Sequence, residues 1–190
     1  MRAGTWAFLV RLLVAFGLWS WLAVYLLPPY ARVVVPVAAG ALKLLQPHGL
    51  QVSLAVAYPQ VSLQFAGPGG EPATGQVPFG LLAYNAVLYL AVLSAWPGPS
   101  WRWRLGFAAT AAPVVVLVHA GDLAMAVESQ VLSVVQKHHY DLRNDFGLWF
   151  SAVKFYNFLS IMALKQVVLV ALYYLQWRLL PWRPAKNGSR

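Results

Sequence analysis

His119 and Asp122 stand three residues apart at the end of an apolar run, so they share one face of a predicted helix. An imidazole and a carboxylate so placed can ligate a metal, relay a proton or bind each other. Further ionisable residues follow in the chain: Glu128, His138, His139, Asp141 and Asp145. We take His119, Asp122, His138 and His139 as candidate metal ligands. The alternative use of the first two is contact between helices or with a partner protein.

The motifs of several enzyme classes are missing from the chain. There is no H-E-x-x-H pair of zinc ligands, no G-x-S-x-G nucleophile turn, no phosphate-binding loop and no dinucleotide fingerprint. The 190 residues include no cysteine, which excludes disulfides, thiolate metal sites and a cysteine nucleophile. The sequence therefore does not show an enzyme, and it predicts no cofactor.

The composition is that of an integral membrane protein. Charged residues make up 10% of the chain, against about 25% in typical soluble proteins. Apolar residues reach 60%, and the mean hydropathy is +0.60. In a soluble protein the net charge of +9 would suggest nucleic acid, but basic loops beside anionic lipid account for it in a membrane protein. We expect an all-α membrane domain, the lipid bilayer as a partner and no nucleic acid.

Four apolar segments predict transmembrane helices, at about residues 6–27, 79–96, 105–126 and 158–178. The loop Pro97–Arg104, PGPSWRWR, carries two arginines and no acid, so we place it in the cytoplasm. The first segment follows a basic N-terminus and has no convincing cleavage site, which favours a retained anchor. Both termini, including the tail 179–190, are then cytoplasmic. A loop at about 127–147 lies outside, with all five acids on the outer side or at its edge.

Residues 31–78 are expected to form the part between the first two spans. Residues 31–47 are apolar but contain Pro36 and two basic residues, which predicts a kinked extension of the first helix or an interfacial helix. In the insert at about 48–78, apolar residues alternate over 51–65, which predicts a small outer β-hairpin. The Gly- and Pro-rich residues 66–78 read as a loop returning to the membrane.

Three polar residues lie within the predicted spans. Asn85 is expected to bond to a neighbouring helix, as intramembrane amides usually do. Lys165 and Gln166 lie in the fourth span, where a lysine costs about 2.5–3.5 kcal/mol on insertion scales. We predict that Asp122 or an acid of a partner compensates Lys165; the alternative is that its long stem carries the amine to the interface. Asn85, Asp122, Lys165 and Gln166 are thus candidate interhelical or partner contacts.

The order of these elements resembles that of the membrane proteins encoded beside bacterial exosortases. The resemblance lies in FLVRLLVAFGLWSWL, QVSLAVAYPQVSLQF, VPFGLLAYNAVLYLAVLSA and PSWRWRLGF. It implies a multi-pass protein of the bacterial inner membrane with an accessory role in protein sorting. Exosortases use a cysteine nucleophile, so this chain would not be the transpeptidase.

These observations lead to three hypotheses for function. The first is a non-catalytic accessory subunit that binds a larger integral membrane protein by helix–helix contact. The second is a small membrane enzyme or metal-binding protein that uses the region of His119, Asp122, His138 and His139. The third is a scaffold subunit of a respiratory or secretion complex.

Overall fold

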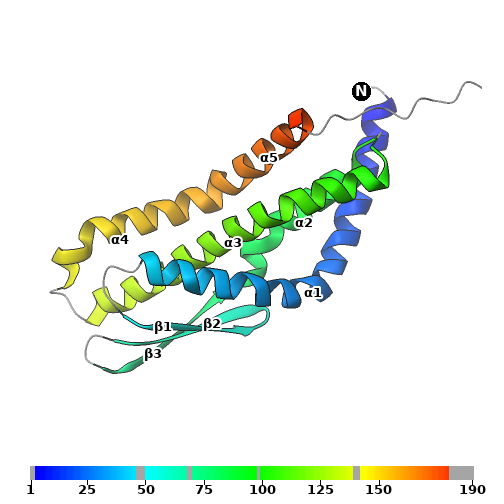
Figure 1. Cartoon of the computed structure of the whole chain (residues 1–190). Helices are drawn as coiled ribbons and strands as arrows, with labels where there is room; N and C mark the ends of the chain where they lie inside the picture. Colours follow the sequence, from blue (N-terminus) through cyan, green and yellow to red (C-terminus); the bar gives the residue numbers. More distant parts are fainter. Residues whose placement is uncertain (1–2, 46–49, 68–69, 98, 139–141, 180–190) are drawn as a thin grey trace, which may run out of the picture.

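The computed structural model describes residues 3–45, 50–67, 70–97, 99–138 and 142–179. The described chain is mostly helical with one small sheet (Figure 1). Its elements are α1 (Ala3–Leu45), β1 (Val52–Ala57), β2 (Gln60–Ala66), β3 (Pro72–Pro78), α2 (Phe79–Ala95), α3 (Trp101–His138), α4 (Leu142–Leu159), the π-helical turn η1 (Ser160–Leu164) and α5 (Lys165–Leu179).

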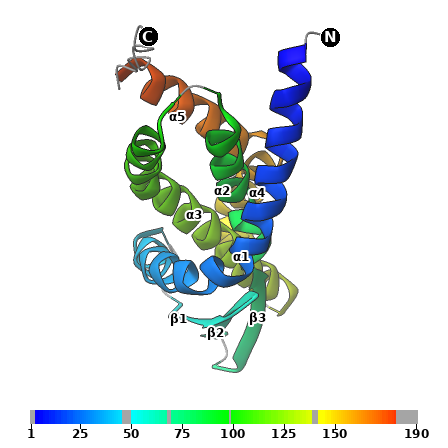
Figure 2. The same cartoon turned by 90° about the vertical axis from the view of Figure 1, so that its right-hand side faces the viewer.

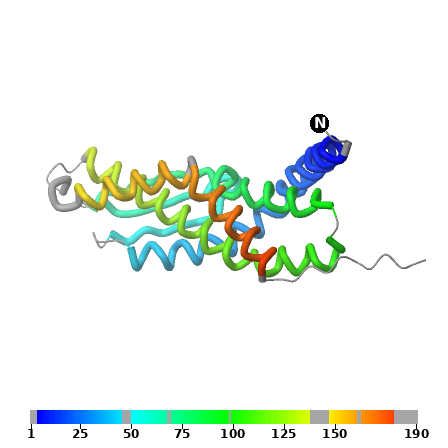
Figure 3. The backbone as a smooth tube through the Cα atoms, turned by 90° about the horizontal axis from the view of Figure 1, so that it is seen from above, coloured from blue at the N-terminus to red at the C-terminus, as the bar shows by residue number. Residues whose placement is uncertain are grey.

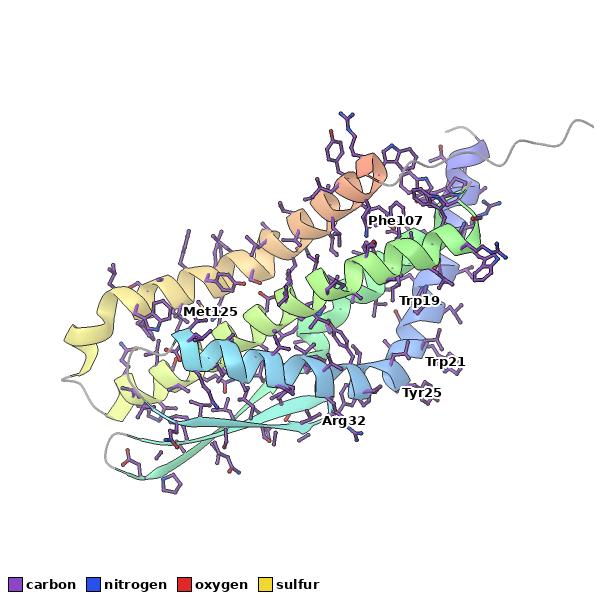
Figure 4. The ribbon with its side chains drawn as sticks, in the orientation of Figure 1. Trp19, Trp21, Tyr25, Arg32, Phe107 and Met125 are labelled. Carbon is purple, nitrogen blue, oxygen red and sulfur yellow. The ribbon has the colours of Figure 1, made fainter. Side chains whose placement is uncertain are left out.

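Helix α1 is a single helix with a sharp bend. Its N-terminal half runs at a steep angle to its C-terminal half, which lies across the sheet (Figures 1 and 3). The bend lies between the labelled residues Tyr25 and Arg32, where Pro28 and Pro29 remove two backbone donors (Figure 4). Residues 31–45 are therefore the kinked extension of the first helix, one of the two expected forms.

The sheet is antiparallel with the order β1-β2-β3. The predicted hairpin is present, with Leu54 opposite Leu63 in the pairing of β1 with β2. The third strand was not expected, since residues 66–78 read as a loop; the correction is that Pro72–Pro78 pair with β2. The sequence signal for this strand is weak because β3 contains a glycine, Gly75, which strands usually avoid. Neighbouring side chains occupy the space that a side chain at this position would need. A Cβ on Gly75 would lie 2.6 Å from Gln130 Oε1 and 3.2 Å from Leu63.

The segment predicted as a loop at 127–147 is helical over most of its length. Helix α3 continues to His138 and α4 begins at Leu142, with residues 139–141 outside the described parts. Val127, Val131 and Val135 extend the buried stripe of α3 four residues at a time. The polar residues between them occupy the other faces of a helix, and they gave this segment the composition of a loop.

The buried apolar residues form two main cores. The first, which we call the sheet-side core, joins residues 31–42 of α1, the inner face of the sheet, the start of α2 and residues 120–135 of α3. The second, the helical core, joins α2, the first part of α3 and α5 around Tyr89, Phe107 and Leu172. Figure 2 shows the sheet beneath the C-terminal half of α1, with α2, α3 and α5 extending away from it.

Within the described residues, two helices are long and apolar enough to cross a membrane, α1 and α3; α2 is a shorter apolar helix of 17 residues. Only 6% of the most apolar stretch of α1 is buried within the chain, against 39% for α3. The N-terminal half of α1 contacts α2 along one side only. Ala15 packs on Ala91 and Ala95, and Trp19 Nε1 donates to Ser94 Oγ at 2.9 Å. Most of its circumference is therefore exposed.

Candidate functional site

Polar side chains from α1, α2, α3, α4 and the α4–α5 junction meet in the interior. We call them the junction cluster: Tyr30, Asn85, His119, Asp122, Tyr156, Ser160 and Lys165. On α2, Asn85 lies between Ala83 of the sheet-side core and Tyr89 of the helical core. The cluster thus occupies the region where the two cores meet.

His119 connects three helices through its two ring nitrogens. Its Nε2 lies 2.9 Å from Asn85 Oδ1, and its Nδ1 lies 2.7 Å from the hydroxyl of Tyr30. Because an amide oxygen only accepts, Nε2 carries a hydrogen, and a neutral ring leaves Nδ1 free to accept from Tyr30. The His119 side chain is 1% exposed. With the hydrogen on Nε2, both ring nitrogens and the Tyr30 hydroxyl have hydrogen-bond partners.

Asp122 is the centre of the second half of the cluster. Its Oδ1 accepts from Tyr156 Oη at 3.1 Å and from Ser160 Oγ. Its Oδ2 lies 3.3 Å from Lys165 Nζ, with the two side chains 2% and 4% exposed. The structure therefore brings together the two residues that the sequence paired. A buried lysine and a buried carboxylate in contact leave this part of the interior without net charge.

The π turn explains why Ser160 and Lys165 reach the same carboxylate. In an α-helix, residues five apart are rotated by about 140° from each other, because each residue turns the helix by about 100°. A π turn instead joins residues five apart by a hydrogen bond and so stacks them on one face. The turn η1 spans Ser160–Leu164, immediately before Lys165. It therefore directs both polar side chains at α3.

The bend of α1 brings Tyr30 into the junction cluster. Tyr30 follows Pro28 and Pro29, so the bend carries its ring inward to His119, with the ring centroids 5.7 Å apart, and to Phe79 at 6.0 Å. Without the bend the C-terminal half of α1 would not lie across the sheet. The position of Tyr30 thus links the prolines of α1 to the histidine of α3.

The described residues do not form the cluster of ligands that a metal site would need. Among them, no three His, Cys, Asp or Glu side chains lie close enough to hold a metal ion. His119 and Asp122 contact the partners given above. The side chain of His138 and all of His139 lie outside the described parts of the structure. The candidate ligands that are described serve contacts between helices.

Two further polar contacts involve residues that the sequence singled out. Gln166 Nε2 donates to Tyr84 Oη at 2.8 Å, which connects α5 to α2. Glu128 is 1% exposed and accepts from Trp149 Nε1 at 2.9 Å, which connects α3 to α4. Both are contacts between helices, the same use that the junction cluster makes of its polar groups.

Sequence reasoning missed several members of these networks. Tyr30, Tyr156 and Ser160 were not singled out, and neither was Gln176, which is 5% exposed. Gln176 accepts from Tyr89 Oη at 2.7 Å and donates to the carbonyl of Phe107 and to Thr110 Oγ1, both at 2.9 Å. An amide within an apolar helix was the available signal for Gln176, the same signal that identified Asn85.

Comparisons with protein-family models, with curated proteins and with solved structures find no match. The functional proposal therefore depends on the geometry of this chain and on its sequence.

Proposed function

We propose that this chain is a non-catalytic accessory subunit of a bacterial inner-membrane system for protein sorting, of the exosortase type. It binds a larger integral membrane protein by helix–helix contact. In this proposal α1, α2, the first part of α3, and η1 with α5 form four spans. The sheet, the C-terminal halves of α1 and α3, and α4 lie on the periplasmic side. The architectural resemblance supports the sorting system, and the positive loop at 97–104 supports the orientation.

The observation that carries the proposal is how the chain distributes its polar and apolar groups. The buried polar groups of the junction cluster contact one another, and neither of two apolar cavities between the helices is lined by His119, Asp122 or Lys165. The N-terminal half of α1 instead exposes large apolar side chains: Trp6, Val10, Leu13, Val14, Leu18, Trp21, Val24 and Tyr25. This distribution suits contact with lipid and with another membrane protein better than it suits chemistry.

Site-specific photo-crosslinking in native membranes tests the proposal. A photoreactive residue at Leu13, which is 71% exposed, should join the chain to a larger membrane protein. The same residue at Ala15 faces α2 and is 9% exposed, so it should give internal products only and serves as the control. Because this chain has no cysteine, a thiol-directed probe on the crosslinked product reports only on the partner.

A captured partner whose cysteine reacts with the probe supports an exosortase-type enzyme. Lipid adducts alone at Leu13 would contradict an accessory subunit. Activity or bound metal in the isolated chain would favour the second hypothesis. A partner that belongs to a respiratory or secretion complex would favour the scaffold hypothesis.

A further inference from the structure

We propose that the end of the helical core farthest from the junction cluster is a binding site for one anionic phospholipid. The acyl chain enters an apolar cavity between α2, α3 and α5, and the phosphate binds arginines at its rim. This inference rests on the membrane location proposed above, and it adds a ligand that the accessory role does not require.

The cavity has the lining that an acyl chain needs. Its volume is about 360 Å³, and it is lined mainly by aromatic and aliphatic side chains from three helices. The aromatic members are Trp96, Trp103, Phe107, Tyr173, Tyr174 and Trp177. Tryptophan and tyrosine concentrate where acyl chains meet headgroups, so this lining fits the boundary of a leaflet better than the middle of a bilayer.

The charge around the cavity determines which lipid fits. Arg104 lines it, and Arg178 stacks on the lining residue Tyr174, with the guanidinium 5.6 Å from the ring centroid and Nε donating to Tyr174 Oη at 3.2 Å. The nearest acid along α3 is Asp122, 15 residues beyond Phe107, which corresponds to about 22 Å of helix. Cations without acids favour an anionic headgroup over a zwitterionic one.

Arg104 also has a free donor. Its Nη2 donates to the Trp96 carbonyl at 2.8 Å and its Nη1 to that of Ser94, so two nitrogens close the end of α2. Its Nε is buried and has no hydrogen-bond partner among the described residues. A buried donor without an acceptor is costly, and a phosphate oxygen that displaced the groups covering this nitrogen would accept from it in a charge-assisted bond.

Native mass spectrometry of the detergent-purified full chain tests the site, with dioleoyl phosphatidylglycerol and dioleoyl phosphatidylcholine as probes. We expect one tightly retained phosphatidylglycerol. Arg178→Gln should weaken its binding about fivefold, the value of one cationic side chain near anionic lipid. Arg11→Gln removes a cation of α1 that is not part of the cavity lining, and it should leave the binding unchanged.

A second pair of variants tests the cavity itself. Val170→Trp should displace the lipid because Val170 lines the cavity, whereas Val167→Trp changes a similarly exposed valine of the same helix outside that lining. Equal retention of the two lipids, or equal behaviour of the two valine variants, overturns the proposal. Displacement of the lipid by inorganic phosphate also overturns it, since the site would then bind an anion without a chain. Each result leaves the crosslink from Leu13 untouched, so the two proposals fail independently.

Discussion

At the scale of single residues, the buried ion pair between Asp122 and Lys165 should be costly to disrupt when only one partner is replaced. Two charges in an apolar interior are tolerated together because each compensates the other. Lys165→Met should leave Asp122 as an uncompensated buried charge and lower the stability in detergent by about 3–5 kcal/mol. Asp122→Asn keeps an oxygen for Tyr156 and Ser160, so it isolates the loss of charge.

The double variant Lys165→Met/Asp122→Asn should recover most of that loss, because no unpaired charge remains. Denaturation of the four proteins of this cycle in one detergent measures the coupling. Lys154→Met is the control, since Lys154 is exposed, donates to Ser133 Oγ at 3.0 Å and lies over the Phe150 ring; its effect should stay within about 0.5 kcal/mol. Strictly additive effects of the two buried substitutions would refute the pair.

The pairing of Lys165 with Asp122 could be predicted because a lysine in an apolar run requires a carboxylate and few are available. All five acids of the chain lie at or beyond residue 71. Ser160 and Tyr156 could not be found in this way, since a hydroxyl costs much less to place in a helix and gives no sequence signal of its own. The contact of Tyr30 with His119 depends on the bend at Pro28 and Pro29, whose direction the sequence does not specify.

At the scale of elements, η1 accommodates one extra residue in an otherwise continuous helix. Deletion of Ala163 should convert the turn to α-helix and place Ser160 and Lys165 four residues apart, which is still one face. The deletion should therefore cost about 1 kcal/mol, a typical value for a tolerated change. Ala163 is exposed, so little packing is lost.

Deletion of Val167 is the matched control. It lies beyond Lys165 in regular helix, so its loss rotates the rest of α5 by about 100° and turns Leu169, Leu172 and Gln176 out of the helical core. Each misplaced leucine costs about 2–5 kcal/mol, and we expect loss of folded protein in size-exclusion chromatography. If the deletions of Ala163 and Val167 reduced the amount of folded protein equally, the π turn η1 would not be a place where one residue can be removed without rotating α5.

The elements themselves were predictable to different degrees. The hairpin was foreseen because alternation of apolar residues in β1 and β2 reports directly on a sheet with one buried face. Strand β3 has one buried valine, a glycine and terminal prolines, so its own sequence does not predict a strand. Its extended structure depends on pairing with β2 and on the hydrogen bond from Gln130. The second half of α3 was missed for a related reason, since its buried stripe is masked by polar residues on the other faces.

At the scale of the whole molecule, the two cores agree with the proposed division of the chain into a membrane part and a water-exposed part. Helix α3 is 38 residues long, which is about 57 Å, nearly twice the thickness of a hydrocarbon core. In the proposed membrane arrangement, part of it therefore extends into water, and its second half packs on the sheet. The junction cluster lies at the change between the two parts, where polar groups are easier to accommodate than at the centre of a bilayer.

This division predicts which residues a membrane-impermeant thiol reagent reaches from outside. The chain has no cysteine, so single substitutions report without background. Thr74→Cys, on the exposed face of β3, should react in intact cells because we place the sheet in the periplasm. Ser100→Cys, between α2 and α3, should react only after the cells are opened, because the arginines beside it hold that loop in the cytoplasm. Labelling of Ser100→Cys in intact cells would invert the orientation, and with it the leaflet in which the phospholipid site lies.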